Sequence, residues 1–214
     1  MTISMPRVDR LPAQERGLTI GDFLVPIRVS DRLHTRLRHI ALIAIGVLLI
    51  AVGARISFPI LGNPVPITGQ TFGVLVASGA LGFRRGIAAT AIYVVLGVVG
   101  VPFFALNKTG IEVLWGATGG YLVGFIVASA IVGRLAELGW DRNLLGAVGA
   151  MLIASAAIYL IGVPWLAVTA GYGPEEAITK GFLAFVVGDA IKLALAAAAF
   201  PAAWWLVGRR PGDR

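Results

Sequence analysis

The residue types that this 214-residue sequence lacks already narrow its function. It contains no cysteine, which excludes a disulfide framework, thiolate chemistry and cysteine-ligated metal. Only 14% of its residues are charged, whereas about 25% are charged in a typical soluble domain, and 57% are hydrophobic. The mean hydropathy is +0.86. A soluble fold of this length cannot bury so much apolar surface, so lipid is the expected solvent for much of the chain.

Missing catalytic residues argue against several enzyme classes. A Ser–His hydrolase needs a histidine near the reacting end of its membrane helices, but the two histidines, His34 and His39, lie on the expected cytosolic side. A two-aspartate protease needs two aspartates in apolar segments, and Asp189 is alone there. Since no nucleotide-binding loop of the form GxxxxGK(S/T) occurs, any ATP must be used by separate subunits. We therefore expect a binding or transport protein rather than an enzyme, with neither cofactor nor metal.

Six apolar segments approach the length that a membrane-crossing helix needs, which is about 20 residues. They are His39–Ile56, Thr68–Leu81, Gly86–Val101, Thr118–Leu138, Leu144–Val168 and Phe182–Val207. The second and third are short and meet at a tight turn over residues 82–85, so they can also be read as one broken hairpin. The sequence predicts an all-α integral membrane protein, a bundle of six transmembrane helices in one domain over residues 39–207.

Basic tails flank this domain. Residues 1–38 hold seven arginines and four acids without a long apolar run, unlike a cleavable signal peptide. We expect a mostly disordered cytosolic tail, with at most one interfacial turn over Phe23–Ile27, and a short cytosolic tail over residues 208–214. The net charge of +7 does not indicate nucleic-acid binding, because the arginines flank apolar segments as membrane anchors do.

The basic residues also predict the orientation of the chain. With six spans, 14 of the 18 lysines and arginines fall on the side that holds both termini, and three fall on the other. Because cytosolic loops are enriched in Lys and Arg, both termini are expected in the cytosol of a multi-pass protein of the cell membrane.

Asp189 and Lys192 form the outstanding pair inside the predicted membrane segments. They are three residues apart and therefore share a helix face. Each ionised group costs about 2.5–3.5 kcal/mol near the centre of a membrane helix, and a contact of about 4 Å returns about 4 kcal/mol at an effective dielectric of about 20. The pair is either a self-neutralising structural contact or the polar floor of a binding pocket. We favour the pocket, because ionisable groups in membrane helices are mostly functional.

Other candidate binding residues combine polar and aromatic side chains that a small ligand can use. They are Thr68, Gln70, Tyr93, Phe103, Asn107, Trp115 and Tyr121. For a single Thr or Tyr, an interhelical hydrogen bond is the more frequent role. Gln70 is the best of this set, since an amide at the entrance of a membrane helix is unusual. We interpret Tyr159 as a packing residue.

Small residues on the first predicted helix indicate close helix packing. Ala44 and Ala51 are seven residues apart and share a face that another helix can approach. That helix can belong to a partner subunit, which would make the two alanines docking residues, or to this chain. The sequence does not separate these possibilities.

Five segments, taken in order, resemble the BioY family, the biotin-specific substrate-binding (S) components of energy-coupling factor (ECF) transporters. They are Pro59–Thr71, Leu81–Gly86, Leu96–Ala105, Gly116–Phe125 and Gly188–Lys192. The resemblance implies six helices and a biotin pocket near the outer face to which Asp189 and Lys192 contribute. It also implies a transmembrane coupling subunit and ATPase subunits as partners. An S component for another vitamin and a solitary transporter that works without ATPase subunits remain as alternatives.

Two positions depart from the pattern of this family. Ala117 stands where members usually have Pro, at the turn before the fourth predicted helix. The Ala-x-x-x-Ala docking pattern of the family's first helix is respaced, because Leu48 follows Ala44. The second departure concerns docking to the coupling subunit and leaves the implied ligand unaffected.

The charge asymmetry generates a prediction about topology. A tag placed after Arg210 is expected in the cytosol, and a tag inserted next to Lys108 is expected outside the cell, because the basic residues concentrate on one side. Accessibility of each tag to a membrane-impermeant reagent in intact cells measures this. Two tags on the same side of the membrane would contradict the six-span arrangement.

Overall fold

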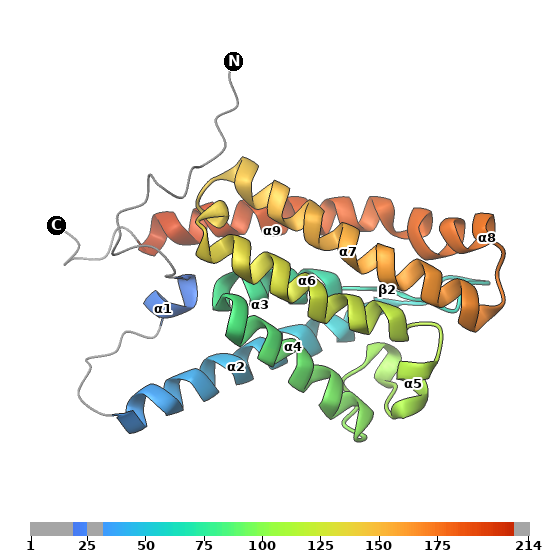
Figure 1. Cartoon of the computed structure of the whole chain (residues 1–214), viewed down its shortest axis with the longest axis horizontal. Coiled ribbons are helices and arrows are strands. Elements are labelled where there is room, and N and C mark those ends of the chain that lie inside the picture. Colours follow the sequence, from blue (N-terminus) through green and yellow to red (C-terminus); the bar gives the residue numbers. More distant parts are fainter. Residues whose placement is uncertain (1–18, 25–31, 208–214) are drawn as a thin grey trace, which may run out of the picture.

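The computed structural model describes residues 19–24 and 32–207, and most of them are helical. Figure 1 shows an elongated bundle whose long helices run roughly along one axis. Six helices correspond to the predicted segments: α2 (Arg32–Arg55), α3 (Gln70–Leu81), α4 (Phe83–Val98), α6 (Gly119–Glu137), α7 (Leu144–Ala170) and α9 (Ala184–Val207). The predicted disorder over residues 1–18, the end of the Phe23–Ile27 turn and the tail 208–214 lie outside the described residues.

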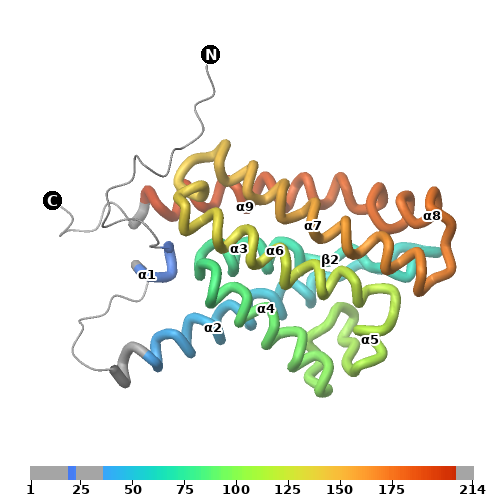
Figure 2. The backbone as a smooth tube through the Cα atoms, viewed as in Figure 1, coloured from blue at the N-terminus to red at the C-terminus, as the bar shows by residue number. Residues whose placement is uncertain are grey.

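Short elements gather at the two ends of the bundle. They are α1 (Ile20–Leu24), β1 (Ser57–Phe58), β2 (Ile67–Thr68), the 3-10 helix η3 (Ala105–Asn107), α5 (Ile111–Trp115), the 3-10 helix η4 (Trp140–Arg142), α8 (Pro174–Ile178) and the π-helix η5 (Thr179–Leu183). Figures 1 and 2 place β2, α5 and α8 at one end and α1 at the other. β1 and β2 pair antiparallel, with Ser57 opposite Thr68. This hairpin was not predicted, because two-residue strands leave no periodicity in a sequence.

Four stretches of the described residues are helices long and apolar enough to cross a membrane. They are Arg36–Arg55, Gly119–Glu137, Leu144–Ala170 and Pro174–Trp205. These stretches and the helical content confirm the predicted all-α membrane fold. α3, with 12 residues, and α4, with 16, are shorter than the about 20 residues of a full crossing. The count of six spans and the cytosolic position of both termini therefore stay predictions.

One residue, Gly82, separates α3 from α4. Its φ of +81° lies in the left-handed region that favours glycine, and its N–H donates to the Ser78 carbonyl at 2.9 Å, where α3 ends. The predicted turn over residues 82–85 is therefore shorter than expected. Arg84 and Arg85 belong to the first turn of α4, which begins before the predicted Gly86.

Glycines allow α6 and α7 to pack closely. A Cβ atom at Gly124 would lie 2.9 Å from the Cα of Ile158, and one at Gly162 would lie 2.6 Å from the ring of Tyr121. Such spacing between backbones is typical of small residues at membrane helix interfaces. It brings Tyr121 of α6 and Tyr159 of α7 edge to face, with ring centroids 6.4 Å apart.

The N-terminal part of the chain enters the fold further than predicted. α2 begins at Arg32, so the expected domain boundary at residue 38 falls inside this helix. The helix α1 also packs on the bundle, where Asp22 forms ion pairs with Arg38 of α2 and Arg85 of α4. Its position depends on charges that are far apart in the sequence, which local patterns do not reveal.

The sixth predicted segment is the C-terminal part of a longer helix. α8, the π-helix η5 and α9 follow one another without a break. A π-turn widens the helix and disturbs the regular hydrogen bonding of its carbonyls. In η5, Asn63 Nδ2 donates to the Lys180 carbonyl at 2.8 Å, and the Tyr121 hydroxyl donates to the Gly181 carbonyl at 2.7 Å. The β1–β2 connection and α6 thereby hold the segment that leads into α9.

Candidate ligand-binding site

A cavity lies between α3, α6, α7 and α9, near the end of the bundle that carries β2. It holds about 700 Å³ of space free of protein atoms, including the part open to solvent. Its lining residues are Val65, Pro66, Thr68, Gln70, Thr71, Phe104, Ala105, Leu106, Lys108, Thr118, Tyr121, Leu122, Phe125, Ile158, Tyr159, Phe185, Asp189 and Lys192.

The predicted charged pair lines this cavity from α9. Lys192 Nζ is 2.8 Å from Asp189 Oδ1, so the ion pair expected from the spacing is formed. The side chains of Asp189 and Lys192 are 14% and 17% exposed. They are therefore sheltered from bulk solvent, yet they remain accessible from the cavity. In such a sheltered position an ion pair keeps more of its attraction than on an exposed surface.

Tyr159 of α7 contributes the third polar group of this wall. Its hydroxyl donates a hydrogen bond to Asp189 Oδ2, so the two carboxylate oxygens have different partners. Its ring contacts Phe182 edge-on, with centroids 4.9 Å apart. The interpretation of Tyr159 as a packing residue only is wrong. No sequence signal could have shown this, because the hydroxyl and its acceptor are 30 residues apart on different helices.

Tyr159 and Asp189 also form a boundary between the cavity and the outside of the bundle. Both residues line a second, mainly apolar groove between α7 and α9, together with side chains such as Leu160 and Val186. Leu160 is 76% exposed, so this groove faces the surroundings of the bundle. The hydrogen bond from Tyr159 to Asp189 thus joins α7 to α9 in the wall that the two spaces share.

Gln70 at the start of α3 supplies a second polar position. Its Nε2 donates to the Tyr93 hydroxyl at 2.5 Å, and this hydroxyl donates to the Phe103 carbonyl at 3.0 Å. Tyr93 is fully buried and Gln70 is 6% exposed, so the relay holds the amide in one orientation. No described residue donates to the Gln70 carbonyl oxygen, which can therefore accept a hydrogen bond from a ligand.

The structure brings five of the nine predicted binding residues together. Asp189, Lys192, Gln70, Thr68 and Tyr121 all line the cavity, although they come from four different elements. Residues from the first and the last third of the chain thus meet where the predicted polar residues cluster.

The other four predicted residues lie outside the cavity lining. Tyr93 supports Gln70 from behind, and the Phe103 ring stacks on Tyr93 with centroids 6.4 Å apart. Trp115 is 66% exposed and stacks on another tryptophan outside the cavity. Asn107 makes no cavity contact either.

The loop between α4 and α6 contributes neighbours of the predicted residues instead. Leu106 and Asn107 have positive φ angles of 56° and 60°, a conformation that is strained for residues other than glycine. Phe104, Leu106 and Lys108 line the cavity. The sequence predicted that this loop contributes to the binding site. Which of its side chains point into the cavity depends on φ angles that tertiary packing sets.

The charges of the lining are asymmetric. Lys108, Lys192 and Asp189 are its ionisable groups apart from tyrosines, and three phenylalanine rings provide apolar surface. Such a site suits a partly apolar molecule with an anionic group and with hydrogen-bond donors. Among the described residues, no group of three or more His, Cys, Asp or Glu side chains could hold a metal ion.

Similarity to known proteins covers most of the chain. The sequence model of the BioY family matches residues 28–209. The chain belongs to the BioY family. It is 42% identical to the biotin transporter BioY of Thermotoga maritima over 149 residues, which are 70% of this chain and 85% of that relative. It is 39% identical to the probable biotin transporter BioY of Pyrococcus horikoshii over 159 residues, 74% of this chain and 91% of the relative.

A solved structure shows the same fold. It is described as the S-component for biotin from an ECF-type ABC transporter, and it matches this chain with a TM-score of 0.74 at 22% identity. The match covers 81% of this chain and 94% of the other. The BioY region of this chain contains the whole cavity, whereas α1 precedes residue 28 and lies outside it.

The predicted docking residues of this BioY chain do not form one surface. Ala44 is exposed, but Ala51 is 6% exposed and packs inside the bundle, so its assignment to an exposed docking face is wrong. Leu42 and Val47, on either side of Ala44, are 2% and 5% exposed, so α2 packs on the bundle there as well and Ala44 lies on its outward face. The exposed apolar face near Ala44 includes Ile45 and Leu48.

The contact between Tyr159 and Asp189 can be tested by its effect on stability. Tyr159→Phe removes the donor to Asp189 Oδ2 and is expected to lower the free energy of unfolding by about 1–3 kcal/mol, because a sheltered acceptor loses its partner. Thermal unfolding in detergent measures this change. Tyr172→Phe is the control, since that hydroxyl makes only a 3.4 Å contact with Lys180.

A double-mutant cycle isolates the contact. Adding Tyr159→Phe to an Asp189→Asn variant should destabilise the protein by clearly less than adding it to the wild type, because the charged acceptor is already gone. Equal effects in both backgrounds would show that the hydroxyl does not act through Asp189.

Proposed function

We propose that this chain is the biotin-binding S component of an ECF-type transporter and takes up biotin across the cell membrane. The observation that carries the proposal is the Asp189–Lys192–Tyr159 constellation in an otherwise largely apolar cavity of a BioY chain. The relatives in Thermotoga maritima and Pyrococcus horikoshii are named biotin transporters, which supports the same ligand here. The chain acts as a transport component rather than as an enzyme.

The chemistry of biotin matches the charges and hydrogen-bonding groups of the cavity. Biotin carries two ureido N–H donors and a ureido carbonyl at one end, an apolar bicycle and chain, and a carboxylate at the other end. Asp189 accepts from one ureido N–H group, and Lys192 donates to the ureido carbonyl. The carboxylate lies toward Lys108, because Asp189 would repel it. The phenylalanine rings of the lining cover the apolar part.

Gln70 and Tyr121 support this arrangement in different ways. Gln70 offers its carbonyl oxygen to a second donor of the ligand, since Tyr93 occupies its amide nitrogen side. Tyr121 lines the cavity with its ring while its hydroxyl holds the Gly181 carbonyl of η5. Substitution of Tyr121 therefore alters both the apolar surface and the approach to α9.

We further propose that biotin uptake requires a transmembrane coupling subunit and ATPase subunits, since the chain has no nucleotide-binding loop of its own. The exposed face of α2 around Ala44 is the proposed contact with the coupling subunit, because a small residue beside Ile45 and Leu48 lets another helix approach.

The charged pair provides the test of biotin binding. Asp189→Asn, Lys192→Met and the double variant are compared for thermal unfolding and for binding of radiolabelled biotin in competition with other vitamins. The double variant leaves no unpaired charge and is expected to fold normally. It should bind biotin at least roughly tenfold more weakly, because hydrogen bonds to charged groups contribute about 1.5–3 kcal/mol each.

The ion pair between Lys180 and Glu176, 2.9 Å apart on the same continuous helix but outside the cavity, is the matched control. Replacing it by Met and Gln should leave biotin affinity unchanged. Wild-type biotin affinity in a well-folded Asp189→Asn/Lys192→Met variant would remove the pair from the binding site.

The docking proposal is tested with Ala44→Leu, which adds bulk to the exposed face of α2. Co-purification with the coupling subunit should fall severalfold while biotin affinity stays at the wild-type value, because Ala44 is exposed and does not belong to the cavity lining. Ala156→Leu, at an exposed position of α7, is the control. Equal co-purification of both variants would assign the coupling contact to another face.

A further inference from the structure

A second recess lies at the opposite end of the bundle from the biotin cavity. It is bordered by α1, the start of α4 and the ends of α3 and α6 that point away from the cavity, together with α2. Arg84, Arg85 and Arg134 line it, with the carboxylates of Asp22 and Glu137. Arg38 adds a fourth guanidinium through its ion pair with Asp22. This is the end at which the sequence concentrates its basic residues.

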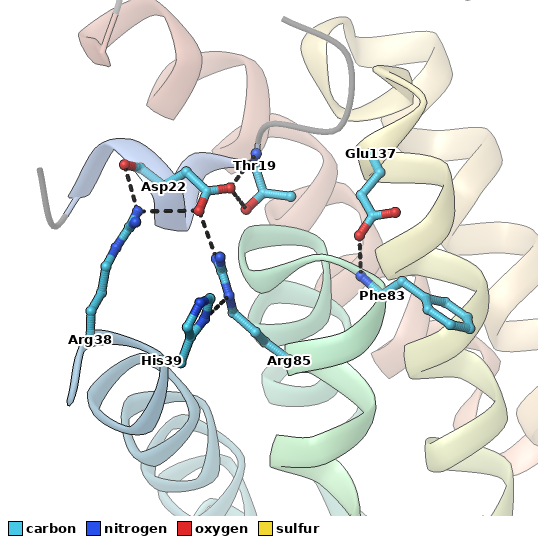
Figure 3. Close-up of polar contacts among 7 residues, drawn as sticks. All are labelled: Thr19, Asp22, Arg38, His39, Phe83, Arg85 and Glu137. Carbon is cyan, nitrogen blue, oxygen red and sulfur yellow. Dashed lines mark hydrogen bonds and ion pairs between the residues drawn. The ribbon is translucent and has the colours of Figure 1, made fainter. Parts of the chain in front are cut away.

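Asp22 is fully occupied within this cluster, as Figure 3 shows. Its Oδ1 lies 2.8 Å from Arg85 Nη1 and 3.2 Å from Arg38 Nη2, and its Oδ2 accepts from the backbone and the hydroxyl of Thr19 at 3.1 Å each. Burial raises the pKa of the Asp22 carboxyl, but the Thr19 hydrogen bonds and Arg85 together hold this pKa below its ordinary value. Asp22 is therefore ionised and uses Arg38 and Arg85 as its counter-charges.

Both carboxylate oxygens of Glu137 also have partners, but its ion pair with Arg134 is weaker than those of Asp22. Its Oε1 accepts from the Phe83 N–H at 2.9 Å, also drawn in Figure 3, and its Oε2 lies 3.1 Å from Arg134. Arg134 is 61% exposed, and an exposed ion pair of this kind contributes little. The guanidinium of Arg134 can therefore turn to another anion without a large loss.

Arg84 completes the surplus of positive charge. It is exposed, and its side chain has no polar partner within the part of the chain that the structure describes. One guanidinium of the recess, Arg84, thus has no described partner, and a second, Arg134, is held only by its exposed ion pair with Glu137 and can turn to another anion. A phosphate group is the anion that such guanidiniums bind with two hydrogen bonds each.

The surroundings of these arginines favour a lipid as the source of the phosphate. Ile43, Leu81 and Phe83 give the recess an apolar side, and Phe83 is 38% exposed. Arg84 and Arg134 lie near the ends of helices, and α6 is long enough to cross a membrane, so the recess is at the depth of the lipid headgroups. Basic pockets between membrane helices on the cytosolic side are suited to anionic headgroups.

We propose that this recess binds the phosphate group of an anionic phospholipid through Arg84 and Arg134. The glycerol and the first acyl carbons rest on Phe83 and Ile43. The wall opposite includes Thr19 and Asp22, which precede the BioY match at residue 28, whereas Arg84 and Arg134 lie within that match. Asp22 holds Arg85 and α1 in place, and the lipid joins α1, α4 and α6 at the membrane surface.

The test compares full-length wild type with Arg84→Gln/Arg134→Gln and with the control Arg55→Gln, an exposed arginine at the other end of α2. Native mass spectrometry measures the binding of phosphatidylglycerol and of phosphatidylcholine, each added in short-chain form to detergent-solubilised protein. The double variant should bind phosphatidylglycerol at least about tenfold more weakly than the wild type. The control should bind it as the wild type does, and phosphatidylcholine should bind weakly to all three proteins.

Soluble competitors identify the source of the phosphate. Displacement of phosphatidylglycerol by millimolar glycerol 3-phosphate would support the phosphate site and add soluble phosphate esters to its ligands, and failure to displace it would support the lipid alone. Displacement by an acidic peptide but not by glycerol 3-phosphate would overturn the lipid assignment in favour of a protein partner. Equal binding of phosphatidylglycerol to the double variant and the wild type, or equal binding of both lipids, would also overturn the proposal.

Discussion

A carboxylate among membrane helices must find its partners within the protein, because lipid offers none, and the site of this BioY chain is organised around that need. Asp189 obtains one partner from its own helix, where Lys192 follows one turn later, and the other from Tyr159 of α7. The first contact requires only sequence spacing. The second requires α7 to lie beside α9 in one rotational orientation. The polar contacts of the cavity therefore depend on how the helices that form its walls pack.

The close contact between α6 and α7 and the π-helix before α9 both serve this arrangement. Glycines at the α6–α7 interface bring Tyr121 and Tyr159 together, and Tyr121 then reaches the Gly181 carbonyl of η5. Asn63, from the connection between β1 and β2, holds the preceding carbonyl of the same π-helix. The polar wall, the loop beside it and the entry into α9 are thus linked by hydrogen bonds that do not involve the ligand.

The two ends of the bundle use charge differently. At the end with the ligand-sized cavity, Asp189 and Lys192 are sheltered and line the cavity wall. At the opposite end, Asp22 is paired with Arg38 and Arg85, and Glu137 is held by the Phe83 N–H, while Arg84 and the exposed Arg134 line a recess with an apolar side. The first arrangement suits selective binding of one ligand, and the second suits attachment to a negatively charged membrane surface.

The sequence by itself determined the helical membrane fold, because hydrophobic composition and segment length act locally and add up along the chain. It also determined the Asp189–Lys192 contact, because three residues on one helix bring two side chains to the same face. Only the tertiary structure decided that Tyr159 donates to Asp189, that Ala51 is buried while Ala44 is exposed, and that Phe104 rather than Phe103 lines the cavity. These outcomes depend on the rotation of helices against their neighbours and on the backbone angles of one strained loop. All of them are set by contacts between residues far apart in the chain, which no local pattern encodes.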